Sequence, residues 1–381
     1  MAPNKSILFV KLGHFSYTND AVALQLARNF PDHTLLVADV KTLARRSNLT
    51  VARNLLEEVT TFGPSVLRNR VDLHAYFFRT PFIFRRLNQM VNAEYGPMAS
   101  ELSFVIQTQG LFSGRIPGVP HLIYTDYTFK DNLDEPEHDT RQFRSRTFLR
   151  YEADLYRTAD AVATTGSHVE RTLINRYGCD PARVRTVHIG ANVRIEPVAT
   201  DLARYAARHV LFVGVEWERK GGPALVEAFT RVARDYPDAR LTIVGCSPAV
   251  SHPQITVAGR IARDRMPTYF KGASLLCMPS IIEPLGIAAI EASLFRMPVI
   301  ATRIGGFFET VTDEETGILV PPNDPAALEV AMRRLFEDPA LMARMGEAGF
   351  NRNRVLFDWD EVGKRLRDVA WSIAPGLRAA A

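Results

Sequence analysis

Short apolar runs alternate with glycine-containing loops and with segments of helical spacing along the whole chain. In the first half, an apolar run at Ser6–Val10 is followed by a loop and by helical spacing over Asp20–Phe30. Ser167 is placed to cap a second helix over His168–Tyr177. Strands are predicted at Ser6–Val10, Leu35–Val40, Phe104–Gln107, His121–Thr125, Ala161–Thr165 and Val184–Val187.

The pattern stops over residues 191–208, which lack an apolar period, and then starts again. We place a linker in this segment and predict a helix from about Pro223 to Tyr236. The second set of strands is predicted at His209–Val213, Leu241–Val244, Ile255–Val257, Leu275–Met278, Pro298–Ala301 and Gly317–Val320. Strands that alternate with helices predict parallel sheets covered on both faces.

The sequence therefore predicts an α/β fold with two doubly wound, Rossmann-like domains, over residues 1–190 and 205–355. Ligands of such domains bind at the carboxyl ends of the strands, and we expect the ligand in a cleft between the two domains. A chain of 381 residues is long enough for two such cores. No repeat of 20–50 residues is visible in the sequence.

Composition narrows the class of protein. Hydrophobic residues make up 46% and charged residues 23% of the chain, which is typical of a globular protein and excludes a mainly disordered one. No apolar run reaches the ~20 residues of a membrane-spanning helix. Lys11 interrupts the first apolar run after Val10, which favours a strand over a signal peptide. Three widely spaced cysteines indicate buried thiols and a cytoplasmic location.

The net charge of +4 is concentrated in the first half of the chain. Within it, residues 66–90 interleave arginines with aromatic side chains. These residues are Arg68, Arg70, Arg79, Arg85 and Arg86, and Tyr76, Phe77, Phe78, Phe82 and Phe84. One interpretation is peripheral contact with the inner membrane surface, and another is a core-packed helix with a solvated arginine face. A nucleic-acid surface lacks any recognised module, so we expect no nucleic-acid partner.

The stretch from Pro279 to Ala292 carries the clearest chemistry. A strand ends at Ser280, and Pro284 suits the first turn of a helix. The backbone amides of Leu285, Gly286 and Ile287 then predict an anion site at the helix N-terminus, most often used for phosphate.

Two glutamates flank these amides. Glu283 and Glu291 are eight residues apart, or ~12 Å along a helix. This is about the distance between the sugar and the ribose of a nucleotide diphosphate-sugar. Carboxylates accept hydrogen bonds from the hydroxyl groups of both. The alternative is that both glutamates are solvated helix charges.

The E-x7-E spacing of Glu283 and Glu291 resembles the signature of glycosyltransferase family 4, the retaining GT-B glycosyltransferases, also called glycosyl transferases group 1. The resemblance extends through MPVIATRIGGFFETVTDEETGILVPPNDPAAL at 297–328. Upstream, it includes VLFVGVEWERKGGPALVEAF at 210–229 and ITVAGRIARDRMPTYFKGASLLCMPS at 255–280. It covers nearly all of residues 155–356 and is much weaker over residues 1–150, the acceptor-binding half of such enzymes.

The resemblance implies roles for residues of the second domain. Glu283 would contact the transferred sugar and Glu291 the nucleotide ribose, while the amides of Gly286 and Ile287 would hold the diphosphate. The backbone at Arg260 and Ile261 would contact the base.

Family members carry a basic pair after the glycine that corresponds to Gly214. Lys220 matches the lysine of that pair, whereas Val215 stands where the arginine is expected, so Arg219 is the candidate substitute. A cation there would stabilise the charge that develops on the departing diphosphate. With Lys220 and the helix N-terminus in that role, no metal cofactor is expected.

The resemblance implies less for the first domain. Many family members carry a histidine in the loop after His121–Thr125, where this chain has Tyr127, with Asp126 beside it as a candidate to orient a hydroxyl. The Gly13 loop matches a glycine-rich loop near the diphosphate, or is a plain strand-to-helix turn. Residues 356–381, with helical spacing over Trp359–Ile373, would form the terminal helix that crosses back onto the first domain and a frayed tail.

The sequence thus predicts a retaining glycosyltransferase that transfers a hexose-type sugar to a hydroxyl of a glycan or glycolipid. UDP-hexose is the first expectation for the donor and GDP-mannose the second. The departures at Val215 and Tyr127 leave a non-catalytic protein that binds a nucleotide sugar as the alternative. A dinucleotide-binding oxidoreductase is excluded because no G-x-G-x-x-G follows either first strand. A hydrolase is disfavoured because Glu283 and Glu291 bracket a whole donor instead of one bond.

Overall fold

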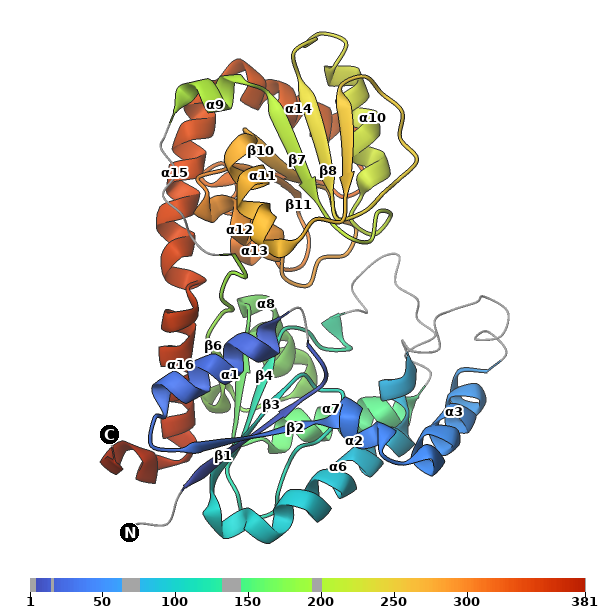
Figure 1. The fold of residues 1–381 in the computed structure, drawn as a ribbon, viewed down its shortest axis with the longest axis vertical. Coiled ribbons are helices and arrows are strands. Elements are labelled where there is room, and N and C mark those ends of the chain that lie inside the picture. The colour runs from blue at the N-terminus through green and yellow to red at the C-terminus, as the bar shows by residue number, and fades with distance from the viewer. Residues whose placement is uncertain (1–4, 15–16, 64–75, 132–144, 194–200, 381) are drawn as a thin grey trace. The chain divides into compact units, whose positions relative to one another are not determined.

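The computed structural model describes residues 5–14, 17–63, 76–131, 145–193 and 201–380. The chain divides into two compact units (Figure 1). Unit 1 combines residues 1–189 with residues 359–381, and unit 2 consists of residues 190–358. Each unit contains one six-stranded parallel sheet, in agreement with the predicted pair of doubly wound domains.

The sheet of unit 1 has the strand order β2-β1-β3-β4-β5-β6. Its strands are β1 (Ser6–Lys11), β2 (Thr34–Asp39), β3 (Leu102–Thr108), β4 (His121–Thr125), β5 (Ala161–Thr164) and β6 (Val184–Thr186). All neighbouring strands pair in parallel. The order reverses at β1 and β3, which is the arrangement that places ligands beyond the carboxyl ends of the strands.

Helices cover both faces of this sheet. One face carries α1 (Thr18–Asn29) and α16 (Trp359–Ile373), whose Val362 and Leu366 pack with Phe9 and Phe104 of the strands. Apolar side chains of α2 (Val40–Arg45) and α6 (Pro81–Tyr95) form a second cluster with the sheet, and those of α7 (Arg146–Thr158) and α8 (Ser167–Thr172) form a third. The remaining elements are α3 (Asn48–Phe62), η1 (Phe77–Arg79), η2 (Gly96–Glu101), η5 (Leu173–Tyr177), η6 (Pro181–Arg183) and η8 (Pro375–Ala380).

The sheet of unit 2 has the strand order β12-β11-β10-β7-β8-β9. Its strands are β7 (His209–Val213), β8 (Arg240–Val244), β9 (Ile255–Gly259), β10 (Leu275–Met278), β11 (Val299–Thr302) and β12 (Gly317–Val320). One apolar cluster joins the sheet to α10 (Gly222–Val232) and α14 (Pro325–Glu337), and another joins it to α11 (Met266–Gly272) and α12 (Ile287–Leu294). The other elements are α9 (Leu202–Ala206), η7 (Arg263–Arg265), α13 (Phe307–Thr310) and α15 (Pro339–Leu356).

Three local predictions are wrong. Ser167 does not cap α8 but is its first residue, and Gly166 precedes it as the N-cap without a side-chain hydrogen bond. The helix predicted to reach Tyr236 ends at Val232. The segment taken as an irregular linker contains α9, which begins where the Asp201 carboxylate accepts a hydrogen bond from the Ala203 amide at 2.9 Å. Residues 194–200 of that segment lie outside the described part of the chain.

The described aromatic side chains of the stretch at 66–90 are buried or half-buried in unit 1, and Phe77 and Phe78 pack against its apolar core. Tyr76 and Phe84 are buried, and the Arg79 guanidinium lies 5.1 Å from the centre of the Phe129 ring. Pro81 begins α6, where the Thr80 hydroxyl accepts a hydrogen bond from the Ile83 amide. This packing favours the interpretation as a core-packed helix. Arg68 and Arg70 lie outside the described residues, and membrane contact through this stretch stays a prediction.

Cysteine burial is only partly as predicted. Cys179 and Cys277 are buried free thiols, whereas Cys246 is half-buried. Burial raises the pKa of the Cys179 thiol to about 11, which keeps it protonated and unreactive at neutral pH. Across the described ranges, none of the helices combines the length and the apolar character needed to span a bilayer.

Candidate active site

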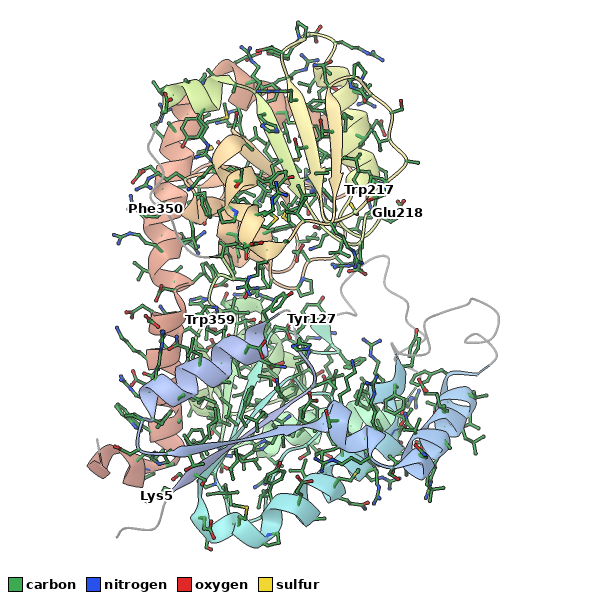
Figure 2. The ribbon with its side chains drawn as sticks, viewed as in Figure 1. Lys5, Tyr127, Trp217, Glu218, Phe350 and Trp359 are labelled. Carbon is green, nitrogen blue, oxygen red and sulfur yellow. The ribbon has the colours of Figure 1, made fainter. Side chains whose placement is uncertain are left out.

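Two loops of unit 2 meet at the carboxyl ends of neighbouring strands. Residues 214–221 follow β7 and residues 279–286 follow β10, and β7 pairs with β10 in the sheet. Figure 2 labels Trp217 and Glu218 in the first loop. The carboxyl edge of a parallel sheet is where such folds bind ligands, so the topology alone brings Lys220 and Glu283 together.

The two loops are locked to each other by backbone contacts. The Ile281 amide donates a hydrogen bond to the Arg219 carbonyl at 2.8 Å. Gly221 has a positive φ of 71°, and a Cβ atom at this position would overlap the carbonyl oxygen of Pro279. Only glycine fits both the conformation and the space, so this residue fixes the distance between the loops.

Glu283 and Lys220 form a buried ion pair at this junction. The Lys220 ammonium donates a hydrogen bond to Oε2 of Glu283. The Lys220 side chain is only 13% exposed and that of Glu283 only 6%. The Ser280 hydroxyl donates to the same oxygen at 3.1 Å, and the Gly286 amide donates to Oε1 at 3.1 Å. Both carboxylate oxygens therefore accept hydrogen bonds, which holds the carboxylate in one orientation.

The environment keeps Glu283 ionised. Burial alone would raise the pKa of this carboxyl, but the charge and hydrogen bond of Lys220 act in the opposite direction, with smaller contributions from Arg219 and the Gly286 amide. Together they hold the pKa of Glu283 below its ordinary value.

Arg219 joins the loops and also pairs within its own loop. Its Nη1 atom donates to the carbonyl of Ile282 at 2.8 Å, and its Nε atom donates to Oε2 of Glu216 at 2.8 Å. The side chain of Val215, at the position of the expected arginine, is 61% exposed. The Arg219 guanidinium is thus already hydrogen-bonded to Glu216 and to the Ile282 carbonyl. That Arg219 replaces the expected arginine in contact with a ligand stays a prediction.

The anion site predicted at 285–287 differs in two respects from the structure. Helix α12 begins at Ile287 with Gly286 as N-cap, so Pro284 lies in the preceding turn and not in the first turn of the helix. The Gly286 amide is also not free, since it donates to Glu283. Leu285 is buried, and Gly286 has a positive φ of 76° that glycine adopts without strain. The carboxylate of Glu283 thus occupies one donor of the predicted phosphate site.

Glu291 of α12 contacts a second polar cluster, formed by Asn192 and Arg263. It is 8% exposed and accepts a hydrogen bond from the Asn192 amide at 3.2 Å. The Arg263 guanidinium donates to the carbonyl of the same Asn192. Burial raises the pKa of Glu291 to about 7, and the Asn192 amide and the Arg263 charge only partly oppose this rise. Glu291 is therefore poised to change its charge near neutral pH.

Gly214, Arg260 and Ile261 border the same edge of the sheet. The Gly214 amide donates to the Val244 carbonyl, and Gly259 ends β9 just before Arg260. The Arg260 side chain is exposed, whereas Ile261 is half-buried against the apolar cluster of α11 and α12. The structure therefore gathers the site residues predicted in unit 2 at the carboxyl ends of β7, β9 and β10.

Gly13 and Asp126 belong to unit 1. The Gly13 amide donates to Asp39 at 3.2 Å, and its carbonyl accepts from Asn19 at 2.8 Å. Burial, with a smaller contribution from the nearby Asp131, raises the pKa of the half-buried Asp126 to about 7. Tyr127 follows in the same loop (Figure 2). A shared role of these residues with Glu283 stays a prediction, as does the cleft between the units.

Ser280, Asn192 and Arg263 contact the site glutamates or their partners without having been assigned a role from the sequence. Ser280 lies two residues after the buried strand β10 and three residues before Glu283, a spacing that could have indicated it. Asn192 and Arg263 are distant in sequence from Glu291, so only the fold reveals them. In the described part of the chain, His, Cys, Asp and Glu side chains form no group of three that could hold a metal ion.

Residues 206–352 match the family model described as Glycosyl transferases group 1. The chain is 30% identical over 294 residues to D-inositol 3-phosphate glycosyltransferase of Streptomyces bingchenggensis, covering 69% of this chain and 63% of that protein. It is 27% identical over 246 residues to glycogen synthase of Mycobacterium tuberculosis, covering 61% and 59%. The chain thus spans about three fifths of the length of these curated relatives.

Solved structures show the same fold. Sucrose-phosphate synthase from Thermosynechococcus elongatus has a TM-score of 0.69 and 21% sequence identity, over 99% of this chain and 100% of that one. Anabaena HepE in complex with UDP and glucose has a TM-score of 0.65 and 18% identity, over 97% and 100%. Together with the two parallel sheets, these likenesses establish the predicted GT-B fold class.

Proposed function

Because residues 206–352 match the family model of glycosyl transferases group 1, we propose that this chain is a retaining glycosyltransferase. It transfers a hexose-type sugar from a nucleotide diphosphate-sugar to a hydroxyl group of a glycan or glycolipid acceptor. The observation that carries the proposal is the buried pair of Lys220 and Glu283 at the carboxyl edge of the unit 2 sheet. Its two residues stand where the family motif requires a cation and a carboxylate.

Lys220 supplies positive charge for the leaving group. A lysine ammonium has three donors, and in the described part of the chain one of them is bonded to Glu283. The remaining donors are available to a diphosphate oxygen. Charge on that oxygen grows as the glycosidic bond breaks, so Lys220 stabilises the transition state more than the bound donor. The proposed reaction therefore needs no metal ion.

Glu283 acts in this proposal as a positioning group for the donor sugar. Both oxygens of Glu283 accept hydrogen bonds from Lys220, Ser280 and Gly286, which hold the carboxylate in one orientation and leave a lone pair to accept from a sugar hydroxyl. The acceptor hydroxyl then attacks from the side of the leaving group, and the departing phosphate takes its proton. Glu291 accepts a hydrogen bond from the nucleotide ribose.

A uridine nucleotide is the first candidate for the donor and GDP-mannose the second. HepE, which shares the fold, has been solved with UDP, with UDP and glucose, and with UDP-glucose. Thermal unfolding in the presence of UDP, GDP, ADP, dTDP or NAD tests this assignment. A nucleotide at 100 times its dissociation constant stabilises the folded state by ~2.7 kcal/mol. A rise in Tm with UDP alone supports the uridine donor, and a rise with NAD alone contradicts the proposed function.

Replacing Lys220 by alanine tests catalysis. We expect Lys220→Ala to lower the rate of UDP release from UDP-glucose by about 100-fold, since removal of one preorganised donor of transition-state charge costs 10²–10³ in rate. The matched control is Lys364→Ala, which removes an exposed lysine of unit 1 that pairs with Glu361.

Unchanged turnover of Lys220→Ala would overturn the role of this lysine. The non-catalytic alternative rests on the departures at Val215 and Tyr127. It predicts a Tm rise with UDP in the unmodified chain but no UDP release above background, with or without a mixture of glycan acceptors.

A further inference from the structure

Helix α3 (Asn48–Phe62) lies at the margin of unit 1, next to α2 and α6 (Figure 1). It has 15 residues and begins where the Ser47 hydroxyl accepts a hydrogen bond from the Thr50 amide at 3.2 Å. Its side chains are arranged in the reverse of the usual order for a helix on a protein surface, with polar groups inside and apolar groups outside.

The inward face of α3 is mostly polar. Thr50, Asn54 and Glu58 are at most 3% exposed and follow one another at intervals of four residues, which places them on one side of the helix. The Asn54 amide donates to the Phe77 carbonyl at 2.8 Å and accepts from the Thr80 hydroxyl. Phe62 completes this face against Tyr76, with ring centroids 4.7 Å apart.

The outward face of α3 is apolar. Leu49 is 79% exposed, Leu56 66% and Val59 41%. The exposed Ala52 completes a spacing of three, four and three residues, which forms one stripe along the helix, and Leu55 adjoins it. A stripe of large apolar side chains on a surface marks a site of interaction with a partner or a membrane.

The charges around this stripe are basic. Lys41 and Arg45 of α2 and Arg53 of α3 are exposed, whereas the exposed Arg46 after α2 is paired with Glu94 at 2.8 Å. The two acidic residues of α3, Glu57 and Glu58, are less exposed than these basic residues. Oε1 of the half-buried Glu57 accepts a hydrogen bond from the Phe82 amide, and Glu58 is fully buried. The exposed charge next to the apolar stripe is therefore positive.

We propose that α3 docks on an anionic lipid surface through Leu49, Leu56 and Val59, with the flanking arginines on the lipid head groups. A helix with one apolar face and adjacent cations lies in the plane of the interface and does not cross the membrane. Apolar burial supplies one part of the affinity, and the attraction of Lys and Arg to the negative surface supplies the other.

The charge pattern favours lipid over a second copy of this chain. In a symmetric dimer each patch would face its own copy, and the exposed arginines would lie near one another. Like charges in such an interface oppose association. An anionic surface meets the apolar and the basic side chains with complementary chemistry. This surface differs from the stretch at 66–90, whose described aromatic side chains mostly pack inside the unit.

Cosedimentation of the full chain with vesicles tests the proposal. The vesicles contain phosphatidylcholine with or without phosphatidylglycerol. We expect binding to the anionic vesicles only, and a weakening of that binding from about 0.05 to 0.5 M salt, where screening shortens the range of the charges. Equal binding to both kinds of vesicle, or binding to neither, would overturn the proposal.

Variants separate the two contributions. The double variant Leu49→Ser, Leu56→Ser removes apolar surface that is proposed to insert between the lipid head groups. We expect its affinity for anionic vesicles to be about tenfold lower. Arg45→Gln and Arg53→Gln should each lower it about fivefold. Val330→Ser is the matched control, because Val330 is 65% exposed on α14 of unit 2. It should leave the affinity unchanged.

Two further readouts guard the interpretation. Circular dichroism melting shows that each variant is folded before it is compared. Light scattering after size exclusion measures the mass of the chain at several concentrations. A dimer that the double leucine variant converts to a monomer would assign the stripe to a second copy and overturn the lipid proposal.

Discussion

Gly221 sets the spacing between the two loops of the candidate active site. We expect Gly221→Ala to destabilise unit 2 by about 2 kcal/mol or more, because alanine at a positive φ is strained and its Cβ would overlap the Pro279 carbonyl. The change should also lower turnover, since Lys220 directly precedes this residue. Chemical denaturation and UDP release measure the two effects.

Gly272→Ala is the control for this prediction. Gly272 lies in the same unit, and a Cβ atom there meets no other atom within 4 Å. This variant should keep both stability and turnover. Loss of activity in both variants would mean that overlap with the Pro279 carbonyl does not explain the loss in Gly221→Ala.

Single residues show where the sequence was sufficient and where it was not. The motif spacing predicted Glu283 and Lys220 as site residues, and the structure places them in one ion pair because their loops follow adjacent strands. The sequence did not reveal that the Gly286 amide donates a hydrogen bond to Glu283, because a one-letter sequence does not show which backbone amides are already hydrogen-bonded. Asn192 and Arg263 were missed for the same reason, as their contacts are made by the fold.

Glu58 makes the stability of α3 depend on pH. Burial raises its pKa to about 7, and neither carboxylate oxygen has a hydrogen-bond partner among the described residues. The folded state therefore holds this proton more tightly than the unfolded chain, whose glutamates titrate near 4.3. The stabilisation is complete below that value and is lost as the pH rises through about 7.

We expect Glu58→Gln to remove this loss, because glutamine stays neutral at every pH. The variant should unfold at nearly the same temperature as the unmodified chain at pH 4.5. At pH 8 it should be more stable by about 3–4 kcal/mol, since each pKa unit corresponds to 1.36 kcal/mol. Glu101→Gln, on an exposed residue, is the control. A stability difference that is the same at pH 4.5 and pH 8 would contradict the prediction.

Elements differed in how well the sequence predicted them. The buried strands read as short apolar runs, because both faces of a parallel sheet are covered. All twelve predicted strands therefore correspond to observed strands, with ends that shift by about two residues at most. Helix α3 was not predicted, although its apolar residues recur at helical spacing, and that spacing alone would have placed inside the side chains that in fact face outward.

The two units have separate apolar cores, and a core substitution should act on its own unit. Leu366 of α16 is 2% exposed in the core of unit 1, and Leu335 of α14 is fully buried in the core of unit 2. Each change to alanine should cost about 2–5 kcal/mol. In Leu366→Ala, hydrogen exchange should speed up in β1–β6 but not in β7–β12.

The reciprocal variant supplies the control. Leu335→Ala should speed up exchange in β7–β12 and leave β1–β6 protected. If either variant accelerates exchange equally in both sheets, the two units unfold as one, and the division of the chain at Ile189 and Trp359 has no energetic meaning.

At the scale of the whole chain, the alternation of strands and helices was enough to predict two doubly wound units, and helical spacing predicted the helix at Trp359–Ile373. The first domain was predicted to end at residue 190 and the second to run from 205 to 355. In the structure the chain divides after Ile189 and again before Trp359. Sequence periodicity predicts that a segment is helical, but not which sheet it covers. The packing of α16 on α1 and β5 is long-range information that only the resemblance to known proteins anticipated.

The split of unit 1 into two segments has a consequence for synthesis on the ribosome. Residues 1–189 emerge first, but α16, which completes their apolar core, follows only after all of unit 2 has been made. At ~5–20 residues per second, the intervening segment takes roughly 10–30 s to translate. During that time the face of the sheet that α16 will cover stays open to water or to a chaperone. The half of the protein that is synthesised first is therefore completed last.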